Sequence, residues 1–209
     1  MVGVAIASVG NEAISFGKWS SGVAWSTSKV PLAVAAARAG SASPDQLFAT
    51  ITQSDNATAE QLWSQLGDGA AERVQSVIRE AGDPKTVVES RRLRAEYTPF
   101  GQTRWSLADQ ARFAAGLPSV PGASGVIDLM RDLSIEHRWG LAAKGCAAKG
   151  GWGPGVVGGY LVRQFAIVSG TVGVALAADV ADGGYEAGVE VVNSLTDWVV
   201  EHLCELTDD

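Results

Sequence analysis

The sequence has few cysteines and histidines and no excess of positive charge, and each shortage excludes a kind of function. Its 209 residues include two cysteines and two histidines. Cys146 and Cys204 form no CxxC pair, and no cluster of histidines and acids has metal-ligand spacing, so we expect neither a metal nor a cofactor. Whether the two cysteines pair is left open. The net charge is -7 and no basic cluster offsets it, so we expect no nucleic-acid partner.

Long hydrophobic runs are also absent. The apolar start, Met1 to Ser8, is too short to cross a bilayer and lacks the basic residues and cleavage site of an export signal, so we expect a strand there and no transmembrane segment. With 46% hydrophobic and 19% charged residues, the composition is that of an ordinary globular chain. The length suits one compact domain with a substantial core.

The first two thirds of the chain predict a hairpin and then a block of helices. Runs at Val2–Ser8 and Ala13–Gly17 flank a turn-forming stretch and predict two antiparallel strands. The Ala- and Val-rich segment Ser26–Ala39 predicts a buried helix, in which Pro31 is tolerable only near the first turn. Apolar periodicity predicts further helices at Pro44–Thr52, Thr58–Leu66, Ala70–Ala81, Ser106–Gly116 and Gly125–Leu133.

The last third predicts strands and a closing helix. Tyr160–Ser169 and Thr171–Asp179 are rich in Val, Ile and Ala and are separated by Gly170, which indicates a second hairpin. Apolar residues from Val191 to Leu203 recur at helical spacing. Strands, a helical block, then strands and a helix predict an α+β fold whose antiparallel sheet is assembled from both chain ends.

Three short motifs carry possible chemistry. In Ser26-Thr27-Ser28-Lys29 a hydroxyl and an amine lie three positions apart, on one face of a helix, so Lys29 can serve as the base that activates Ser26. We expect the Ser26 hydroxyl and the Lys29 amine within roughly 2.6 to 3.5 Å of each other. Ser54-Asp55-Asn56 opens a helix, and Lys149-Gly150-Gly151 starts an apolar strand. Taken singly, these motifs also fit a helix cap or an edge strand.

The order and setting of these motifs resemble the three-motif signature of class A β-lactamases and penicillin-binding proteins, over nearly the whole chain. Trp139-Gly140 and the stretch Gly151 to Pro154 are similar to those of small β-lactamase-like extracytoplasmic proteins of actinobacteria. The resemblance implies a β-lactamase/transpeptidase-like fold in one structural domain. Residues 1–20 and 140–209 would form an α/β subdomain with a five-stranded antiparallel sheet and a C-terminal helix, and residues 21–139 a helical subdomain.

The resemblance also implies a role for each motif residue. Ser26 would be the acylated nucleophile, Lys29 its base and Ser54 a proton relay to the leaving nitrogen. The backbone amides of Ser26 and Trp152 would form the oxyanion hole. The substrate would be held by Asn56, Lys149, Gly150 and Gly151.

Three departures from the family pattern bear on activity. Gly150 stands where the family has Thr or Ser, so one hydroxyl for the substrate carboxylate is missing. Ser54 follows Ser26 after 28 positions, about half the usual interval, so the loop beside the cleft is shortened. The ExxLN loop that activates the deacylating water is not matched, and Glu96 is only a positional candidate for this base.

Two competing sites are rejected on context. Residues Gly153 to Gly158 fit GxGxxG, but a strand rather than a helix is expected after them, so they do not form a phosphate cradle. A His-based triad is also rejected, because His137 lies in a loop beside Arg138 and His202 lies on the C-terminal helix, where a structural role is favoured.

The sequence therefore predicts a serine-acylating hydrolase for β-lactams or D-Ala-type cell-wall peptides, with slow deacylation. The alternative is a catalytically degenerate relative that binds a peptidoglycan-like or protein ligand. By resemblance the protein is expected outside the cytoplasm, although the sequence leaves a cytoplasmic location open.

Overall fold

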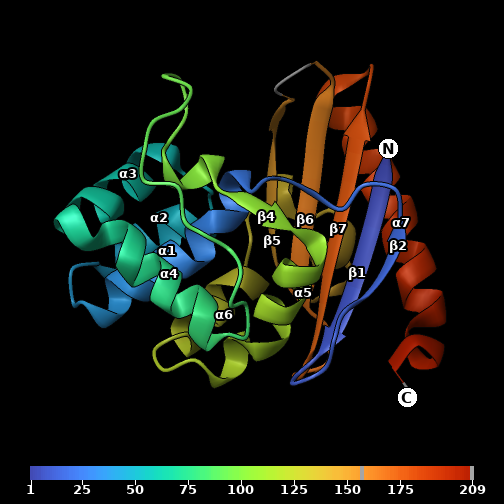
Figure 1. The fold of residues 1–209 in the computed structure, drawn as a ribbon, viewed down its shortest axis with the longest axis horizontal. Coiled ribbons are helices and arrows are strands. Elements are labelled where there is room, and N and C mark those ends of the chain that lie inside the picture. Colours follow the sequence, from blue (N-terminus) through green and yellow to red (C-terminus); the bar gives the residue numbers. More distant parts are fainter. Residues whose placement is uncertain (156–157, 208–209) are drawn as a thin grey trace.

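Both ends of the chain contribute strands to the main sheet (Figure 1). The protein is described by a computed structural model, which covers residues 1–155 and 158–207. The five strands are β1 (Val2–Ser8), β2 (Ile14–Gly17), β5 (Ala147–Pro154), β6 (Tyr160–Ile167) and β7 (Val172–Val180). They pair antiparallel in the order β2-β1-β7-β6-β5, which confirms the predicted sheet.

Helices cover both faces of this sheet (Figure 1). On one face lies α7 (Gly184–Thr207), whose side chains Val192 and Val199 are fully buried. On the other lies α5 (Leu107–Gly116), which comes from the central part of the sequence but packs on β1 and β7. The contact is close: a Cβ on Gly173 would lie 2.1 Å from the Ala111 carbonyl oxygen, so only glycine fits there.

The remaining helices form a cluster around α1 (Lys29–Arg38). The others are α2 (Pro44–Ile51), α3 (Asn56–Gln65), α4 (Ala70–Glu80) and α6 (Ser124–Arg131). Nearly all of α1 is buried, which fits its small apolar side chains, because a helix surrounded by others is apolar on every face. It begins three residues later than predicted: residues Trp25–Ser28 form a 3₁₀ turn, and Pro31 is then the third residue of the α-helix.

A second, two-stranded sheet is formed by β3 (Ser21–Val23) and β4 (Arg104–Ser106). It was not predicted, because strands of three residues are too short to show a periodic pattern of apolar residues. Arg163 on β6 anchors this second sheet. Its guanidinium is fully buried and donates hydrogen bonds to the carbonyl oxygens of Gly22, Val23 and Trp105. Burial lowers the pKa of Arg163 to about 9.

Further 3₁₀ turns occur at Gly67–Gly69, Phe100–Gln102, Leu117–Ser119, Ile135–His137 and Gly140–Lys144. Strand β6 begins directly after the GxGxxG pattern, as expected, while residues 156–157 of that pattern lie outside the described residues. Cys146 and Cys204 are both free thiols.

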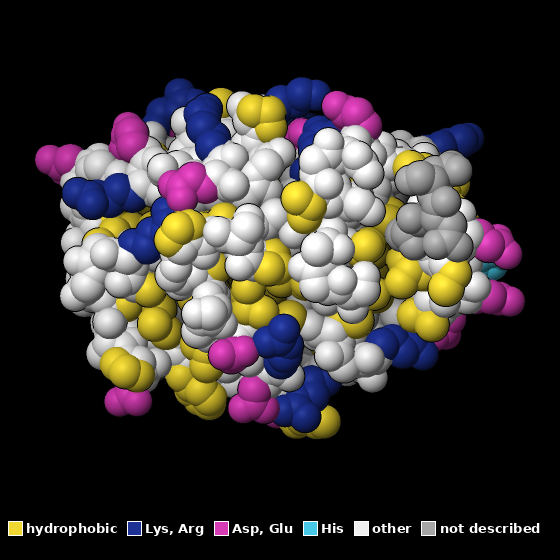
Figure 2. All heavy atoms as spheres, turned by 90° about the horizontal axis from the view of Figure 1, so that it is seen from below, with side chains coloured by type: hydrophobic (Ala, Val, Ile, Leu, Met, Phe, Trp, Pro, Cys, Tyr) yellow, Lys and Arg dark blue, Asp and Glu magenta, His cyan; other side chains and the backbone are white. Residues whose placement is uncertain are grey.

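The surface carries both signs of charge. Lys, Arg, Asp and Glu side chains are intermixed over the face seen in Figure 2. Within residues 1–155 and 158–207, no helix is both long enough and apolar enough to span a membrane.

Candidate active site

The turn that carries Ser26 is strained and firmly held. Trp25 has a φ of 51°, in the left-handed region that a bulky residue rarely adopts. The Ser28 hydroxyl donates to the Trp25 carbonyl at 2.7 Å, and the Thr27 hydroxyl donates to the Ala24 carbonyl at 2.5 Å. Ser26 itself is half-buried and lines a cavity of about 450 Å³. Backbone strain that the surroundings maintain beside a hydroxyl lining a cavity is typical of a functional position.

Lys29 is almost completely buried and lines the same cavity, but among the described residues its amine does not form the predicted hydrogen bond with Ser26. Its amine donates to the Ser54 backbone carbonyl, to Ser54 Oγ at 3.3 Å and to Asn56 Oδ1 at 2.7 Å. No hydrogen bond joins Lys29 Nζ to Ser26 Oγ in the part of the chain that the structure describes. The predicted Ser26–Lys29 hydrogen bond is thus wrong for the free protein, because the start of α3 supplies three oxygen acceptors for the amine instead.

Burial makes Lys29 a usable base. Removal from water lowers its pKa from 10.5 to about 7, and the nearby Asp55 carboxylate opposes part of this shift. Near neutral pH a large share of Lys29 is therefore the neutral amine, which can accept a proton. Asp55 does not pair with the amine directly, since its carboxylate caps α3 by accepting the Thr58 backbone N–H at 2.6 Å.

Ser54 connects the two lysines of the site. Its φ of 56° is the second positive value for a non-glycine residue in the described chain. Ser54 Oγ accepts hydrogen bonds from Lys29 Nζ at 3.3 Å and from Lys149 Nζ at 2.8 Å. Because both lone pairs of the oxygen are used in this way, its own proton remains available to a third group. This arrangement suits a proton relay.

Lys149 enters the site from β5 and is almost completely buried. Burial lowers its pKa well below the usual value, and the nearby charge of Lys29 lowers it further. The two ammonium groups thus disfavour each other, and no carboxylate forms an ion pair with either lysine among the described residues. An anion bound at the bottom of the cavity would therefore favour the charged form of either lysine.

Strand β5 lies directly against the Ser26 turn. A Cβ on Gly151 would lie 2.9 Å from the Ser26 backbone nitrogen and 2.8 Å from the Ala24 carbonyl oxygen, so glycine is required for this approach. Trp152, the next residue, lines the same cavity. The sheet edge is thus brought beside the Ser26 amide, where the resemblance would put an oxyanion hole.

Gly150 is oriented differently from the expectation. A Cβ at this position would lie 2.5 Å from Cζ2 of Trp139. The space beside Gly150 is filled by this indole ring, and Gly150 is not among the residues that line the cavity. A Thr or Ser side chain at position 150 would therefore collide with the Trp139 ring.

Two carboxylates line the cavity, and the sequence pointed to one of them. Glu96 lines it from an exposed loop. Glu60 also lines it and forms an ion pair with Arg92 at 2.6 Å. Glu60 was missed, although it follows Asn56 by four positions on α3 and so shares its helix face, a signal visible in the sequence.

His137 also lines the cavity, although the sequence analysis placed it only in a loop and assigned it no role in the site. Its ring lies 5.3 Å from that of Trp152, centroid to centroid. No sequence signal placed it here, because it lies in an irregular segment whose path depends on the packing of α6 and β5.

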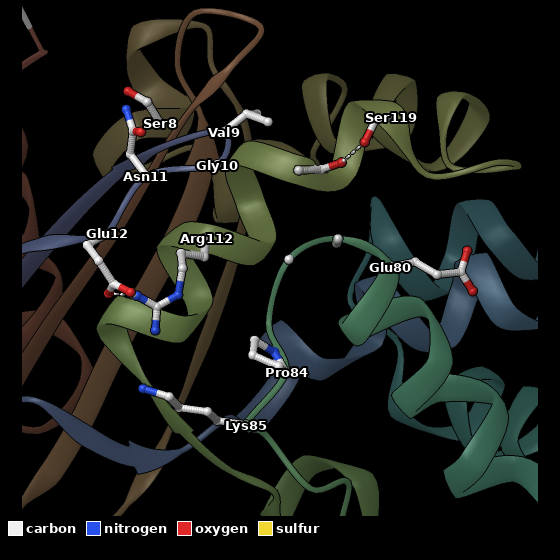
Figure 3. Close-up of a pocket in the computed structure, with 13 residues that line it drawn as sticks. Ser8, Val9, Gly10, Asn11, Glu12, Glu80, Pro84, Lys85, Arg112 and Ser119 are labelled. Atoms are coloured by element: carbon white, nitrogen blue, oxygen red, sulfur yellow. Dashed lines mark hydrogen bonds and ion pairs between the residues drawn. The ribbon is translucent and has the colours of Figure 1, made fainter.

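A second cavity, of about 340 Å³, lies between the β1–β2 turn and the end of α4 (Figure 3). Arg112 points toward Glu12 in this cavity and pairs with it at 2.9 Å and with Asp109 at 2.5 Å. None of the three motifs contributes a residue to it. Its arginine is neutralised, unlike the lysines of the Ser26 cavity.

Comparisons with known proteins show which solved structures share this fold. No protein-family model matches the sequence, and no curated protein matches it. Solved structures do match, among them the chromosome-encoded β-lactamase of Vibrio parahaemolyticus, which is 14% identical with a TM-score of 0.71 over 97% of this chain and 93% of that one. A mutant of the extended-spectrum β-lactamase TLA-1 is 13% identical with a TM-score of 0.74 over 97% and 92%.

An ancestral class A β-lactamase is 19% identical, with a TM-score of 0.66 over 96% of this chain and 94% of that one. The chain therefore has the α+β fold of class A β-lactamases, as the motif order predicted. At these identities the likeness establishes the fold alone, and the chemistry has to be argued from the site.

Proposed function

We propose that the protein is a serine hydrolase of the β-lactamase and penicillin-binding type, which is acylated at Ser26 by β-lactams or by cell-wall peptides ending in D-alanine. One observation carries the proposal: two buried lysines, Lys29 and Lys149, converge on the hydroxyl of Ser54 in the cavity that Ser26 lines. The fold adds support. The proposal also places the protein outside the cytoplasm, where such substrates occur.

In the acylation step the Ser26 hydroxyl gives its proton to the neutral Lys29 amine, and Ser26 Oγ attacks the substrate carbonyl carbon. The resulting oxyanion is stabilised by the backbone amides of Ser26 and Trp152. The C–N bond then breaks, and the leaving nitrogen takes a proton from Ser54, which is resupplied by Lys29. Binding of substrate has to bring Ser26 and Lys29 together, since catalytic hydrogen bonds often form only in the complex.

Deacylation is the slow step in this scheme. Water must hydrolyse the ester, and the carboxylates that line the cavity are poorly suited to activate it. Glu96 is exposed on its loop, and Glu60 is held by Arg92. An acyl-enzyme therefore forms faster than it breaks down.

The second candidate function is binding without catalysis. It is favoured by the missing Ser26–Lys29 hydrogen bond and by the lack of space beside Gly150. In that case the cavity holds a peptidoglycan-like ligand or a protein ligand that Ser26 does not attack.

Intact-protein mass spectrometry after incubation with a fluorescent penicillin separates the two. We expect the wild type to gain the mass of one penicillin and to keep it for many minutes, and Ser26→Ala to gain none. Ser20→Ala is the matched control, because it removes an exposed serine six positions earlier and should still form the adduct. Absence of an adduct with several penicillins would favour the binding function.

A further inference from the structure

His137 is held in the cavity wall by one side of its ring. It ends the 3₁₀ turn Ile135–His137, between α6 and β5. Its Nδ1 lies 3.1 Å from Ser134 Oγ and 3.5 Å from the Thr52 carbonyl oxygen. The ring also packs against Trp152. Nε2, on the opposite side of the ring, makes no hydrogen bond within the described residues, so this edge is available to a ligand in the cavity.

The surroundings disfavour the charged form of this imidazole in the free protein. Burial lowers the pKa of His137, and the charges of Lys149 on β5 and Lys29 on α1 lower it further. The Thr52 carbonyl and the Glu136 carboxylate oppose the shift. A ligand anion near the lysines would cancel their charge and favour the imidazolium.

The cavity has a place for such an anion. Neither lysine forms an ion pair with a carboxylate in the described part of the chain, so an anion in the cavity would be the direct partner that favours their charged forms. A hydroxyl at position 150 cannot supply the second contact, because the Trp139 ring occupies that space. His137 lines the cavity, interacts electrostatically with Lys149, and can both donate a hydrogen bond and gain a charge.

We propose that His137 is a specificity-determining residue, which binds the carboxylate of the substrate through Nε2 together with Lys149. This inference rests on the proposed function for the identity of the substrate. As the anion binds, His137 takes one proton from solvent, and binding of acidic ligands therefore strengthens as the pH falls toward 6.

Proton NMR of the imidazole Cε1–H signals tests the contact without any acylation. The chain has only two histidines, so His137→Gln assigns both signals, and His202 on α7 is the internal control. In Ser26→Ala protein we expect benzylpenicillin to raise the titration midpoint of His137 by about one pH unit, and its methyl ester to leave it unchanged. No shift with benzylpenicillin, or an equal shift with the ester, would overturn the proposal.

Acylation kinetics give a second reading. In His137→Phe the preference for benzylpenicillin over its methyl ester should fall about tenfold in the second-order rate constant, as expected for loss of one charged hydrogen bond. His137→Gln should retain part of the preference, and His202→Gln should retain all of it. An unchanged preference in His137→Phe contradicts the inference. If the wild type forms no adduct, the proposed function fails while the NMR result still decides the role of His137.

Discussion

The pKa of Lys29 predicts the pH dependence of acylation. The base works as the neutral amine, and its pKa lies at about 7 in the folded protein. About a tenth of Lys29 is then neutral at pH 6, about half at pH 7 and about nine tenths at pH 8. We expect the acylation rate to rise about ninefold between pH 6 and pH 8 and to level off above, as measured by stopped-flow with a fluorescent penicillin.

Asp55→Asn is the matched perturbation. The Asp55 carboxylate raises the pKa of Lys29, so its removal should move the midpoint of the profile to lower pH. Asparagine is also a good N-cap, so α3 should keep its first turn and the melting temperature should change little. His202→Gln, on α7 and outside the cavity, should leave the midpoint in place. A rate that is flat from pH 6 to 8, or that rises steadily to pH 10, would refute Lys29 as the base.

Three further predictions concern stability. Gly151→Ala should destabilise the fold by about 1 to 3 kcal/mol in chemical denaturation and abolish the adduct, because its Cβ overlaps backbone atoms of the turn that carries Ser26. Gly125→Ala in α6, with no atom within 4 Å of its Cβ, should be neutral or stabilising, and a comparable loss there would contradict the packing argument. Gly150→Thr should lower the melting temperature without faster acylation unless Trp139 is also made smaller. Lys29→Met should stabilise the folded state by about 1 to 3 kcal/mol at pH 7. In the unfolded wild type the Lys29 amine is protonated at this pH, whereas the buried amine of the native state binds the proton weakly, and the substitution removes this cost of folding. The gain in stability should shrink as the pH rises toward 10.5.

The larger elements were predictable because their patterns are long. The apolar stripe from Val191 to Leu203 gave the closing helix, and the runs at 160–169 and 171–179 gave strands β6 and β7 to within two residues. The three-residue strands β3 and β4 were missed. Their pairing depends on Arg163, which is distant in sequence from both.

The motif order predicted that residues from several motifs would meet, but it did not predict their contacts. The structure brings Ser26, Lys29, Ser54 and Asn56 to one cavity, with Lys149 hydrogen-bonded to Ser54 at its base. Which acceptor each amine prefers depends on how α1, α3 and β5 meet, and helical spacing holds no such information.

The packing around the site was equally hidden. Trp139 fills the space beside Gly150, and His137 faces the cavity, because the segment between α6 and β5 folds back along the sheet edge. These contacts join residues from segments whose sequence carries no periodic signal.

Mapping the adduct tests the central claim most directly. Trypsin cleaves after Lys18 and, where the Lys29 amine is unmodified, after Lys29. This releases the peptide from Trp19 to Lys29, which contains every hydroxyl of the turn that carries Ser26. After reaction with penicillin, fragmentation of this peptide should place the acyl group on Ser26. An acyl group on Ser28 or on the Lys29 amine, or an unmodified peptide from protein that carries an adduct elsewhere, would contradict the account.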